Sequence, residues 1–293
     1  MPAIRTENLT KYYGRHRGIE GVCLEVTRGE CFGFIGPNGA GKSTTIRALL
    51  GLIRPTSGQA QVLGLDIGKE NPQILARVGY LPSESAFYPG MRVRDILTFS
   101  ARLRKRDCRQ TADDLCQRLR LDPTRKAQEL SFGNRKKVAI LSALQHNPEL
   151  LILDEPTSGL DPLMQKEFFA IIKERNRQGT TVFLSSHVLS EVQRNCTRAA
   201  IIRAGQIIAC DRVEALAKTN AKRVHLQGEA DLSALAGLRD LRQTGESVSF
   251  LYSGEMDRLL VVLSAGRIQD LSISEPDLEE VFLHYYEKRG DRL

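Results

Sequence analysis

The chain has 293 residues, of which 41% are hydrophobic and 26% are charged, a composition typical of a globular protein with about two domains. Its longest apolar runs, such as Leu259 to Leu263, are far shorter than the ~18 residues expected of a membrane-spanning helix. The first residues, Met1 to Thr10, also lack the apolar core of a signal peptide, so we expect a protein that is made and kept in the cytosol.

The net charge of +7 admits two interpretations. It could favour nucleic acid or an anionic membrane, or it could be a modest excess spread over a solvated surface. The densest basic run, Arg102 to Arg106, has no interleaved aromatic side chains that could stack on bases, so we favour the solvated surface. The six cysteines show neither a C-x-x-C pair nor metal-ligand spacing, which indicates reduced, packed thiols and argues against a disulfide framework.

Two strands are predicted at the start of the chain, Ala3 to Leu9 and Glu20 to Val26, with a turn between them that carries two adjacent tyrosines. The second tyrosine, Tyr13, could stack on an adenine ring; the alternative is a tyrosine with a structural role only. An antiparallel β region therefore precedes the first motif that carries chemistry.

A glycine-rich loop follows a short predicted strand, Glu30 to Ile35, and precedes a helix predicted over Lys42 to Leu52. Its nine residues match the pattern G-x-x-x-x-G-K-[ST] and are Gly36, Pro37, Asn38, Gly39, Ala40, Gly41, Lys42, Ser43 and Thr44. Glycines let successive backbone N–H groups approach an oxyanion, and the following helix presents its positive end to the same ligand. We interpret the loop as a cradle for a nucleoside phosphate rather than as a turn without a ligand.

Two side chains of this loop have specific roles in that interpretation. Lys42 is placed to reach the β- and γ-phosphates, and the Ser43 hydroxyl is placed to ligate a Mg²⁺ ion that bridges them. The loop therefore predicts a site for a nucleotide together with Mg²⁺.

The segment after the loop changes from strands to helices. Strands are predicted at Gln59 to Leu63 and at Ala76 to Leu81. Between Met91 and Asn147 the apolar residues recur at helical spacing. This pattern predicts a helical insertion, at about residues 88–147, between the two halves of a nucleotide-binding core.

A second chemical centre lies at Leu150 to Glu155, where four apolar residues are followed by two carboxylates. The apolar run is typical of a buried parallel strand, and the carboxyl end of such a strand is where open α/β sheets bind ligands. Asp154 is a candidate for holding Mg²⁺ through a water, and Glu155 for accepting a proton from an attacking water. A strand that ends in Asp-Glu is ambiguous alone, but the upstream phosphate loop makes it a strong signal.

The next apolar strand, Thr180 to Ser185, brings His187 to the same edge of the predicted sheet. An isolated histidine at a strand end is more often structural, but its position beside the other motifs favours a functional role here. Strands at Ala199 to Arg203 and Gln206 to Cys210 then form a predicted hairpin that closes the core.

Together these motifs resemble the ATP-binding subunit of an ATP-binding cassette (ABC) transporter. The phosphate loop is similar to the Walker A motif of that family, and the strand that ends at Glu155 is similar to Walker B. The segment Leu130 to Asn134 is similar to the family signature, usually Leu-Ser-Gly-Gly-Gln, and Ser158 to Asp161 matches the D-loop. Walker motifs occur in many NTPases, so the signature and the D-loop are what specify this family.

The sequence departs from the family pattern at two places. In the signature, Phe132 replaces the first glycine and Asn134 replaces the glutamine, whereas the serine and the second glycine remain. At the position of the usual Q-loop glutamine the chain has Ser83, followed by Glu84, and these two become the candidates for sensing the metal and water. Neither departure removes a catalytic charge.

The resemblance implies ATP hydrolysis by in-line attack of water on the γ-phosphate. Glu155 is then the base that orients and deprotonates the water, with Lys42 and His187 at the phosphates as further catalytic residues. Tyr13 matches the aromatic residue that stacks on adenine. The resemblance also assigns nucleotide contacts to three residues outside the phosphate loop, which are Ser131, Gly133 and Asp161.

The same resemblance implies partners. In this family the signature of one subunit faces the phosphate loop of another, so we expect a homodimer around two ATP molecules. We also expect a separately encoded membrane permease, more often that of an exporter, which holds the protein at the cytoplasmic face of the membrane. The stretch from Ser83 to Val93 is the expected permease contact, and no nucleic acid partner is expected.

The expected fold is α/β, a P-loop NTPase core with an antiparallel β subdomain and a helical subdomain. We assign residues 1–215 to this cassette and residues 216–293 to a small α+β appendage. Three strands are predicted in the appendage, together with a helix over Met256 to Ala265 and a last helix from Glu275. Similar appendages occur in bacterial ABC proteins that serve separate permeases; the alternative is a packing module without a ligand.

Two other functions compete with a transporter subunit. A soluble ABC ATPase that acts on ribosomes or nucleic acid usually carries two cassettes or a long coiled coil in one chain, and neither is visible here. A P-loop kinase or other transferase, in which Glu155 would serve a hydroxyl acceptor, leaves the signature and the D-loop unexplained.

Overall fold

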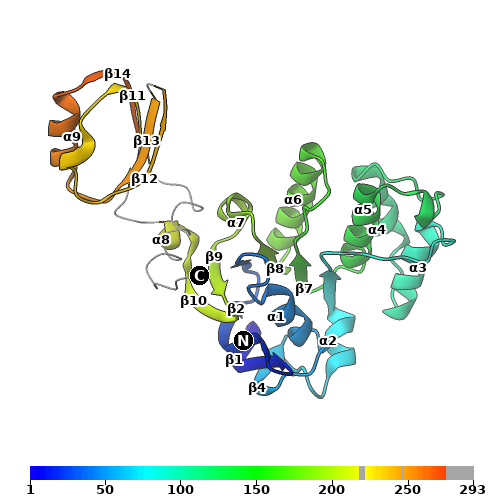
Figure 1. The fold of residues 1–293 in the computed structure, drawn as a ribbon. Helices are drawn as coiled ribbons and strands as arrows, with labels where there is room; N and C mark the ends of the chain where they lie inside the picture. The colour runs from blue at the N-terminus through cyan, green and yellow to red at the C-terminus, as the bar shows by residue number, and fades with distance from the viewer. Residues whose placement is uncertain (218–221, 246, 275–293) are drawn as a thin grey trace. The chain divides into compact units, whose positions relative to one another are not determined.

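The computed structural model describes residues 1–217, 222–245 and 247–274, and the chain divides into two compact units, Met1–Val213 and the part that follows (Figure 1). A six-stranded sheet lies at the centre of the first unit, in the order β10-β9-β3-β8-β7-β6. Its strands are β3 (Cys31–Ile35), β6 (Val78–Leu81), β7 (Leu150–Asp154), β8 (Thr181–Ser186), β9 (Arg198–Arg203) and β10 (Gln206–Arg212). All neighbours pair in parallel except β10, which forms an antiparallel hairpin with β9. Every residue of β3, β7 and β8 is buried, as is typical of parallel strands covered on both faces.

A second sheet of the same unit is antiparallel and has the order β2-β1-β4-β5. It consists of β1 (Pro2–Tyr13), β2 (His16–Thr27), β4 (Ser57–Val62) and β5 (Leu65–Asp66). One hydrophobic core joins the two sheets and includes Ile4 of β1, Ile46 of the first helix and Phe183 of β8. The phosphate loop therefore starts from a strand that is anchored in this shared core.

Helices cover the six-stranded sheet and form a group of their own. Figure 1 shows α3, α4 and α5 gathered to one side of the sheet, where the helical periodicity of the sequence predicts them. The helices of the first unit are α1 (Lys42–Leu49), α2 (Asn71–Arg77), α3 (Val93–Leu103), α4 (Arg109–Arg118), η1 (Ala127–Glu129), α5 (Phe132–Leu144), α6 (Pro162–Arg177) and α7 (Leu189–Asn195), with α8 (Val213–Ala217) at its boundary. This α/β arrangement of a P-loop core, an antiparallel sheet and a helical group confirms the fold class expected from the sequence.

Two predicted elements have different bounds in the structure. Helix α1 ends at Leu49, three residues early, because Gly51 has a positive φ of 64° that leaves the helical conformation. The strand predicted from Ala76 begins only at Val78, since the preceding residues belong to α2. That helix has a proline in its first turn, where proline is well tolerated.

In its described residues, the second unit contains a four-stranded antiparallel sheet of order β12-β13-β11-β14, against which helix α9 packs. Its elements are β11 (Lys222–Glu229), η2 (Leu232–Ala234), β12 (Leu238–Thr244), β13 (Ser247–Tyr252), α9 (Met256–Ser264) and β14 (Arg267–Ser274). Phe250 and Tyr252 of β13 pack with Leu259 of α9 in a separate core. The sequence predicted this helix and three of the strands but not β12, and the helix predicted from Glu275 lies outside the described residues.

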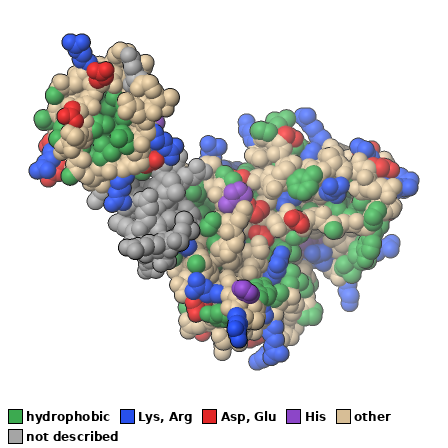
Figure 2. Space-filling view, in the orientation of Figure 1, with side chains coloured by type: hydrophobic (Ala, Val, Ile, Leu, Met, Phe, Trp, Pro, Cys, Tyr) green, Lys and Arg blue, Asp and Glu red, His purple; other side chains and the backbone are tan. Residues whose placement is uncertain are grey.

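On the face of the first unit that Figure 2 shows, the basic side chains are scattered. Figure 2 shows Lys and Arg side chains distributed over the visible face, between acidic and apolar ones. Across the described residues, no helix combines the length and the apolar character needed to cross a membrane.

Candidate nucleotide-binding site

The phosphate loop connects β3 to α1 and depends on glycine at specific positions. Gly39 and Gly41 have positive φ angles of 79° and 111°, a backbone region that other residues rarely adopt. At Gly36 a Cβ atom would lie 2.5 Å from the carbonyl oxygen of Ile202 in β9. The loop can therefore keep this shape only with glycine at these positions.

A cavity of about 380 Å³ lies against the loop. The residues that line it come from the end of β1 and the start of β2, from the phosphate loop and the start of α1, and from the segments directly after β6 and β7. They are Tyr13, Arg17, Gly18, Pro37, Asn38, Gly39, Gly41, Lys42, Ser43, Thr44, Ser83 and Glu155. Most of the residues predicted to contact a nucleotide thus surround one space. Two predicted loop residues lie behind it: Ala40 is buried, and Gly36 contributes its carbonyl oxygen to a hydrogen bond described next.

Lys42 is buried and folds back over its own loop. Its ammonium group donates hydrogen bonds to the carbonyl oxygens of Gly36 at 2.6 Å and Pro37 at 3.2 Å. The same nitrogen lies 3.2 Å from Oε1 of Glu155. A buried cation is costly unless it is paired and hydrogen-bonded, and these contacts provide both. They also keep the ammonium at the cavity wall, where a phosphate would replace part of its partners.

Asp154 ends β7 and is only 1% exposed. Its Oδ2 accepts a hydrogen bond from the Ser43 hydroxyl at 2.8 Å, and its Oδ1 accepts one from the Ser185 hydroxyl at 2.5 Å. The two predicted metal candidates, Ser43 and Asp154, are therefore in direct contact. Hydroxyl and carboxylate oxygens are ligands that Mg²⁺ prefers, so this pair fits the predicted ion.

Glu155, directly after the strand, has a strained backbone and a carboxylate between two basic groups. Its φ of 50° lies in the left-handed region that non-glycine residues uncommonly occupy. Oε2 lies 2.6 Å from Nδ1 of His187, and Oε1 lies near the ammonium of Lys42. The Lys42 contact is an ion pair without hydrogen-bond geometry, so the buried Oε1 has no hydrogen-bond partner among the described residues. This oxygen can still accept a hydrogen bond from a molecule in the cavity.

Comparison with known proteins identifies the family. The family profile described as ABC transporter matches residues 19–158. The bacitracin transport ATP-binding protein BcrA of Bacillus licheniformis is 34% identical over 96% of both chains. A Nod factor export ATP-binding protein I, from Cupriavidus metallidurans, is also 34% identical over 96% of both chains. The chain belongs to the ATP-binding proteins of ABC transporters. It is an ATP-binding, ATP-hydrolysing transporter subunit, as the sequence predicts.

Solved structures show the same family fold. The ATP-binding subunit of an ABC transporter is similar with a TM-score of 0.70 and 27% identity, over 73% of this chain and 91% of that chain. An ABC transporter cassette in its ADP conformation is similar with a TM-score of 0.63 and 27% identity, over 74% of this chain and 94% of that chain. The fold that carries the cavity is thus the fold of an ABC ATPase cassette.

The signature and the D-loop of this ABC ATPase contact each other rather than the cavity. Ser131 caps α5, with its hydroxyl accepting from the Asn134 N–H at 3.3 Å, and Asp161 caps α6. At Gly133 a Cβ atom would lie 2.7 Å from the carbonyl oxygen of Gly159 in the D-loop. Among the described residues that line the cavity, none comes from either motif. The structure therefore does not bring the signature and the phosphate loop of one chain together.

The two Q-loop candidates have different surroundings. Ser83 lines the cavity, whereas the exposed Glu84 is absent from the cavity lining within the described part of the chain. Tyr13 also lines the cavity, is 44% exposed and packs over Gly18, where a Cβ atom would lie 2.9 Å from the ring. The ammonium of Lys11 lies 5.4 Å from the centre of the same ring. Tyr13 is thus held at the cavity with a large part of its surface free to contact a base.

Sequence reasoning missed two residues that organise the site. The Ser185 hydroxyl donates to Asp154, and its only sequence signal is its place in the polar end of β8, directly after the apolar residues of the strand. Glu191 of α7 accepts hydrogen bonds from the hydroxyls of Thr157 at 2.5 Å and Ser186 at 2.9 Å. It thereby ties the segment after Glu155 to the end of β8, a contact that no local pattern indicates.

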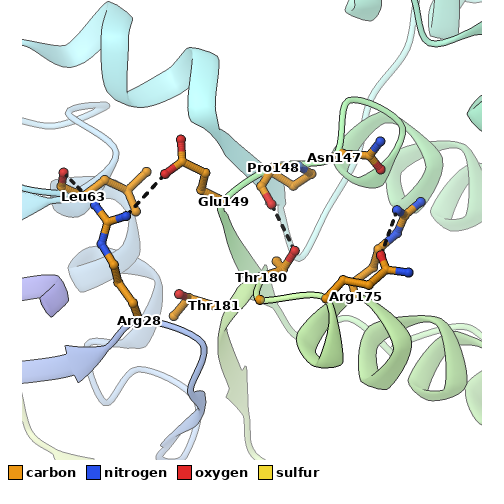
Figure 3. A pocket seen from close by; sticks show the side chains of 10 residues that line it. Arg28, Leu63, Asn147, Pro148, Glu149, Arg175, Thr180 and Thr181 are labelled. Carbon is orange, nitrogen blue, oxygen red and sulfur yellow. Dashed lines mark hydrogen bonds and ion pairs between the residues drawn. The ribbon is translucent and has the colours of Figure 1, made fainter. Parts of the chain in front are cut away.

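A second cavity, of about 400 Å³, lies at the opposite end of β7 and β8, at their amino termini. Figure 3 shows Arg28 extended toward Leu63 and Glu149, and Thr180 bonded to Pro148. Arg28 lies 3.5 Å from the Glu149 carboxylate, which Arg77 also binds at 2.6 and 2.7 Å. The acidic group at this second cavity, Glu149, is therefore already paired with arginine, and Arg175 adds a further cation to the lining.

Proposed function

We propose that the chain hydrolyses ATP in the cavity at the phosphate loop and that Glu155 is the general base. The observation that carries this proposal is the placement of Glu155, at the end of β7, with a buried Oε1 that no described donor satisfies. A general base must lie within hydrogen-bond reach of the proton that it accepts. An oxygen at the cavity wall with free acceptor capacity meets this requirement for a water beside the γ-phosphate.

The other charged groups would stabilise the phosphates. Phosphoryl transfer is catalysed mainly by positioning and by neutralisation of charge. Lys42 would exchange its loop carbonyls for β- and γ-phosphate oxygens, and the N–H groups at the start of α1 would bind the same oxygens. His187 uses Nδ1 for Glu155, which leaves Nε2 for the γ-phosphate. Tyr13 would stack on the adenine ring.

The resident cofactor in this proposal is Mg²⁺. Ser43 would hold it directly and Asp154 through a water, which fits the contact between these two side chains and their oxygen chemistry. Mg²⁺ bound there supplies positive charge that neutralises the β- and γ-phosphate oxygens. Ser83 at the cavity wall is a further candidate for contact with its water shell, and Glu84 would need a change in the Q-loop to reach it.

The active form that we propose is a homodimer with two ATP molecules between the subunits. Ser131, Gly133 and Asp161 cap or contact elements of their own chain, away from the cavity that they are expected to complete. A second copy can supply them to the γ-phosphate in trans. ATP would then join the subunits, and its hydrolysis would separate them. The protein would thus alternate between a dimer with bound ATP and separate subunits, depending on the nucleotide.

We also propose a separately encoded permease as the membrane partner and export as the direction of transport. Support comes from the functions of the relatives described above, which are bacitracin transport and Nod factor export. The protein would then lie at the cytoplasmic face of the membrane, bound to the permease near Ser83 to Val93. We assign residues 1–215 to the ATPase cassette and residues 216–293 to an accessory domain.

The variant Glu155→Gln tests this function. We expect it to bind Mg²⁺-ATP normally, to lose turnover by about 10²- to 10⁴-fold, and to form a stable dimer of twice 32.7 kDa in light scattering. The wild-type chain with ADP is the control and should remain monomeric. Unchanged hydrolysis in the variant would remove Glu155 from the role of base, and a monomer with bound ATP would contradict the trans arrangement.

A further inference from the structure

Lys136 is a buried lysine on α5, the helix that begins at the signature serine. Its side chain is among the few charged ones in the interior and is 3% exposed. The ammonium group donates hydrogen bonds to two consecutive carbonyl oxygens, those of Pro82 at 3.1 Å and Ser83 at 3.0 Å. These two residues directly follow β6, so the lysine connects the signature helix to the Q-loop.

Burial of this cation has a cost that an apolar side chain would avoid. Burial lowers the pKa of Lys136 to about 8, and the negative charges of Asp154 and Glu155 oppose that decrease. A buried ammonium persists when it is both hydrogen-bonded and close to opposite charge. Lys136 has both kinds of partner, and both belong to the segments that surround the cavity.

The segment that Lys136 binds, Pro82 and Ser83, forms part of the cavity wall. Ser83 lines the cavity together with Glu155, and its carbonyl oxygen is one of the two that accept a hydrogen bond from Lys136. Loops that line a site need support from packed elements if their side chains are to be held in a productive position. Here the support is a single cationic group with two hydrogen bonds to adjacent carbonyls.

We propose that Lys136 is a positioning residue for ATP hydrolysis, because its ammonium group fixes the Q-loop backbone at Ser83 and joins that wall of the cavity to the signature helix. The proposal rests on the proposed function of this site. Lys136 itself would not touch the nucleotide. Its loss would misplace the Q-loop, and with it the water beside Glu155, while the phosphate loop stays intact. The defect should therefore fall on kcat rather than on ATP affinity.

Three variants of the full chain test this role. Lys136→Met keeps the length of the side chain and removes its hydrogen-bond donors, whereas Lys136→Arg keeps a cation with donors. Lys173→Met, an exposed lysine on α6, is the matched control. The measurements are steady-state ATP hydrolysis, the Kd for a fluorescent ATP analogue, and amide hydrogen exchange of the peptide over residues 82–88 without nucleotide.

We expect kcat of Lys136→Met to fall about 10- to 100-fold, since small displacements in a site have effects of this size. The Kd should change by less than about threefold, because the phosphate contacts remain. Amide exchange of the peptide over residues 82–88 should become faster in Lys136→Met. Lys136→Arg should recover most of the wild-type kcat and of the wild-type exchange rate, and Lys173→Met should match the wild type in both.

Two results would overturn the proposal: unchanged exchange of residues 82–88 in Lys136→Met, or a fall in ATP affinity equal to the fall in kcat. Glu155→Gln, measured in the same assay, separates this outcome from a failure of the proposed function. If that variant turns over like the wild type, the assigned base is wrong. The exchange measurement still decides whether Lys136 holds Ser83.

Discussion

Strand β7 is flanked by a glutamate at each end, and the two differ in exposure and in hydrogen-bond partners. Glu149, before the strand, is 45% exposed and accepts hydrogen bonds from Nε and Nη2 of Arg77, with Arg28 nearby. Glu155, after the strand, is 17% exposed, pairs with Lys42 and His187, and keeps an oxygen without a hydrogen-bond donor. The first carboxylate is satisfied at the surface, whereas the second is half-buried and its buried Oε1 is incompletely satisfied.

The difference shows which end of the sheet can do chemistry. A carboxylate held by two arginines has little capacity left for a proton or a water. A buried carboxylate with spare acceptor capacity is unfavourable for stability, and such groups gather at functional sites. Helix α1 and the phosphate loop lie at the carboxyl ends of the strands, so only Glu155 has a phosphate site beside it.

The largest effect that we expect after loss of the base itself is that of His187→Ala. This change removes the proposed donor to the γ-phosphate together with the partner of Glu155 Oε2. Loss of one donor of this kind typically lowers kcat about 10²- to 10³-fold. The measurement is steady-state hydrolysis at saturating ATP. His225→Ala, an exposed histidine of β11, is the control and should retain full activity. A His187→Ala variant as active as this control would refute the assigned role.

Asp154→Asn should weaken the metal site with little change in shape. The carboxylate loses its charge beside Ser43, and loss of a residue that supports a metal typically lowers the affinity about 10- to 100-fold. The Mg²⁺ concentration for half-maximal ATPase activity should rise by this factor. Asp122→Asn, at an exposed turn, should leave it unchanged, and equal Mg²⁺ requirements in the two variants would contradict the assignment.

Removal of the aromatic ring at the cavity rim should have a smaller effect. An aromatic stacking contact contributes about 0.5–1.5 kcal/mol, so Tyr13→Ala should weaken ATP binding about 2- to 10-fold. Binding of inorganic triphosphate, which has no base, should be unaffected in the same variant. Equal losses for both ligands, measured by calorimetry, would mean that the tyrosine supports the loop rather than the adenine.

The smallest effect belongs to the other end of β7. The hydrogen bonds from Arg77 hold the pKa of Glu149 in the folded protein below its value in the unfolded chain. The ion pair therefore stabilises the fold at any pH above the pKa of the unfolded chain, and this stabilisation is lost as the pH falls through the pKa of the folded protein. Because Glu149 is substantially exposed, Glu149→Gln should lower the unfolding free energy by only about 0–1 kcal/mol at neutral pH. Thermal melts should show the difference between the two proteins disappear in acid, and a difference that grows there would contradict this sign.

The sequence predicts most of the local structure that carries the site. The phosphate loop and the strands before Asp154 and His187 have strong local signals, since an apolar run followed by polar residues marks where a buried strand ends. Strand β12 was missed because most of its side chains are exposed and most are polar, so its pattern resembles a loop. It pairs with β13 through backbone bonds, which side-chain periodicity does not report.

The contacts that tune the site could not be predicted in the same way. Ser185, Glu191 and Lys136 act through partners that are distant in sequence, with the Lys136 ammonium bound to carbonyl oxygens more than fifty residues earlier. Such pairings depend on the packing of α5 and α7 against the sheet. From residue type alone, Lys136 would be predicted to lie on the surface and Glu191 to be a glutamate in the first turn of a helix. Their contacts with the site become visible only in the tertiary structure.

A single-turnover measurement on the two glutamates of β7 tests the central claim most directly. Glu149→Gln and Glu155→Gln make the same chemical change at the two ends of one strand, and both proteins can be mixed with radiolabelled Mg²⁺-ATP under identical conditions. The account predicts phosphate release at the wild-type rate for Glu149→Gln and a rate lower by about 10²- to 10⁴-fold for Glu155→Gln. Equal rates for the two variants would contradict the account.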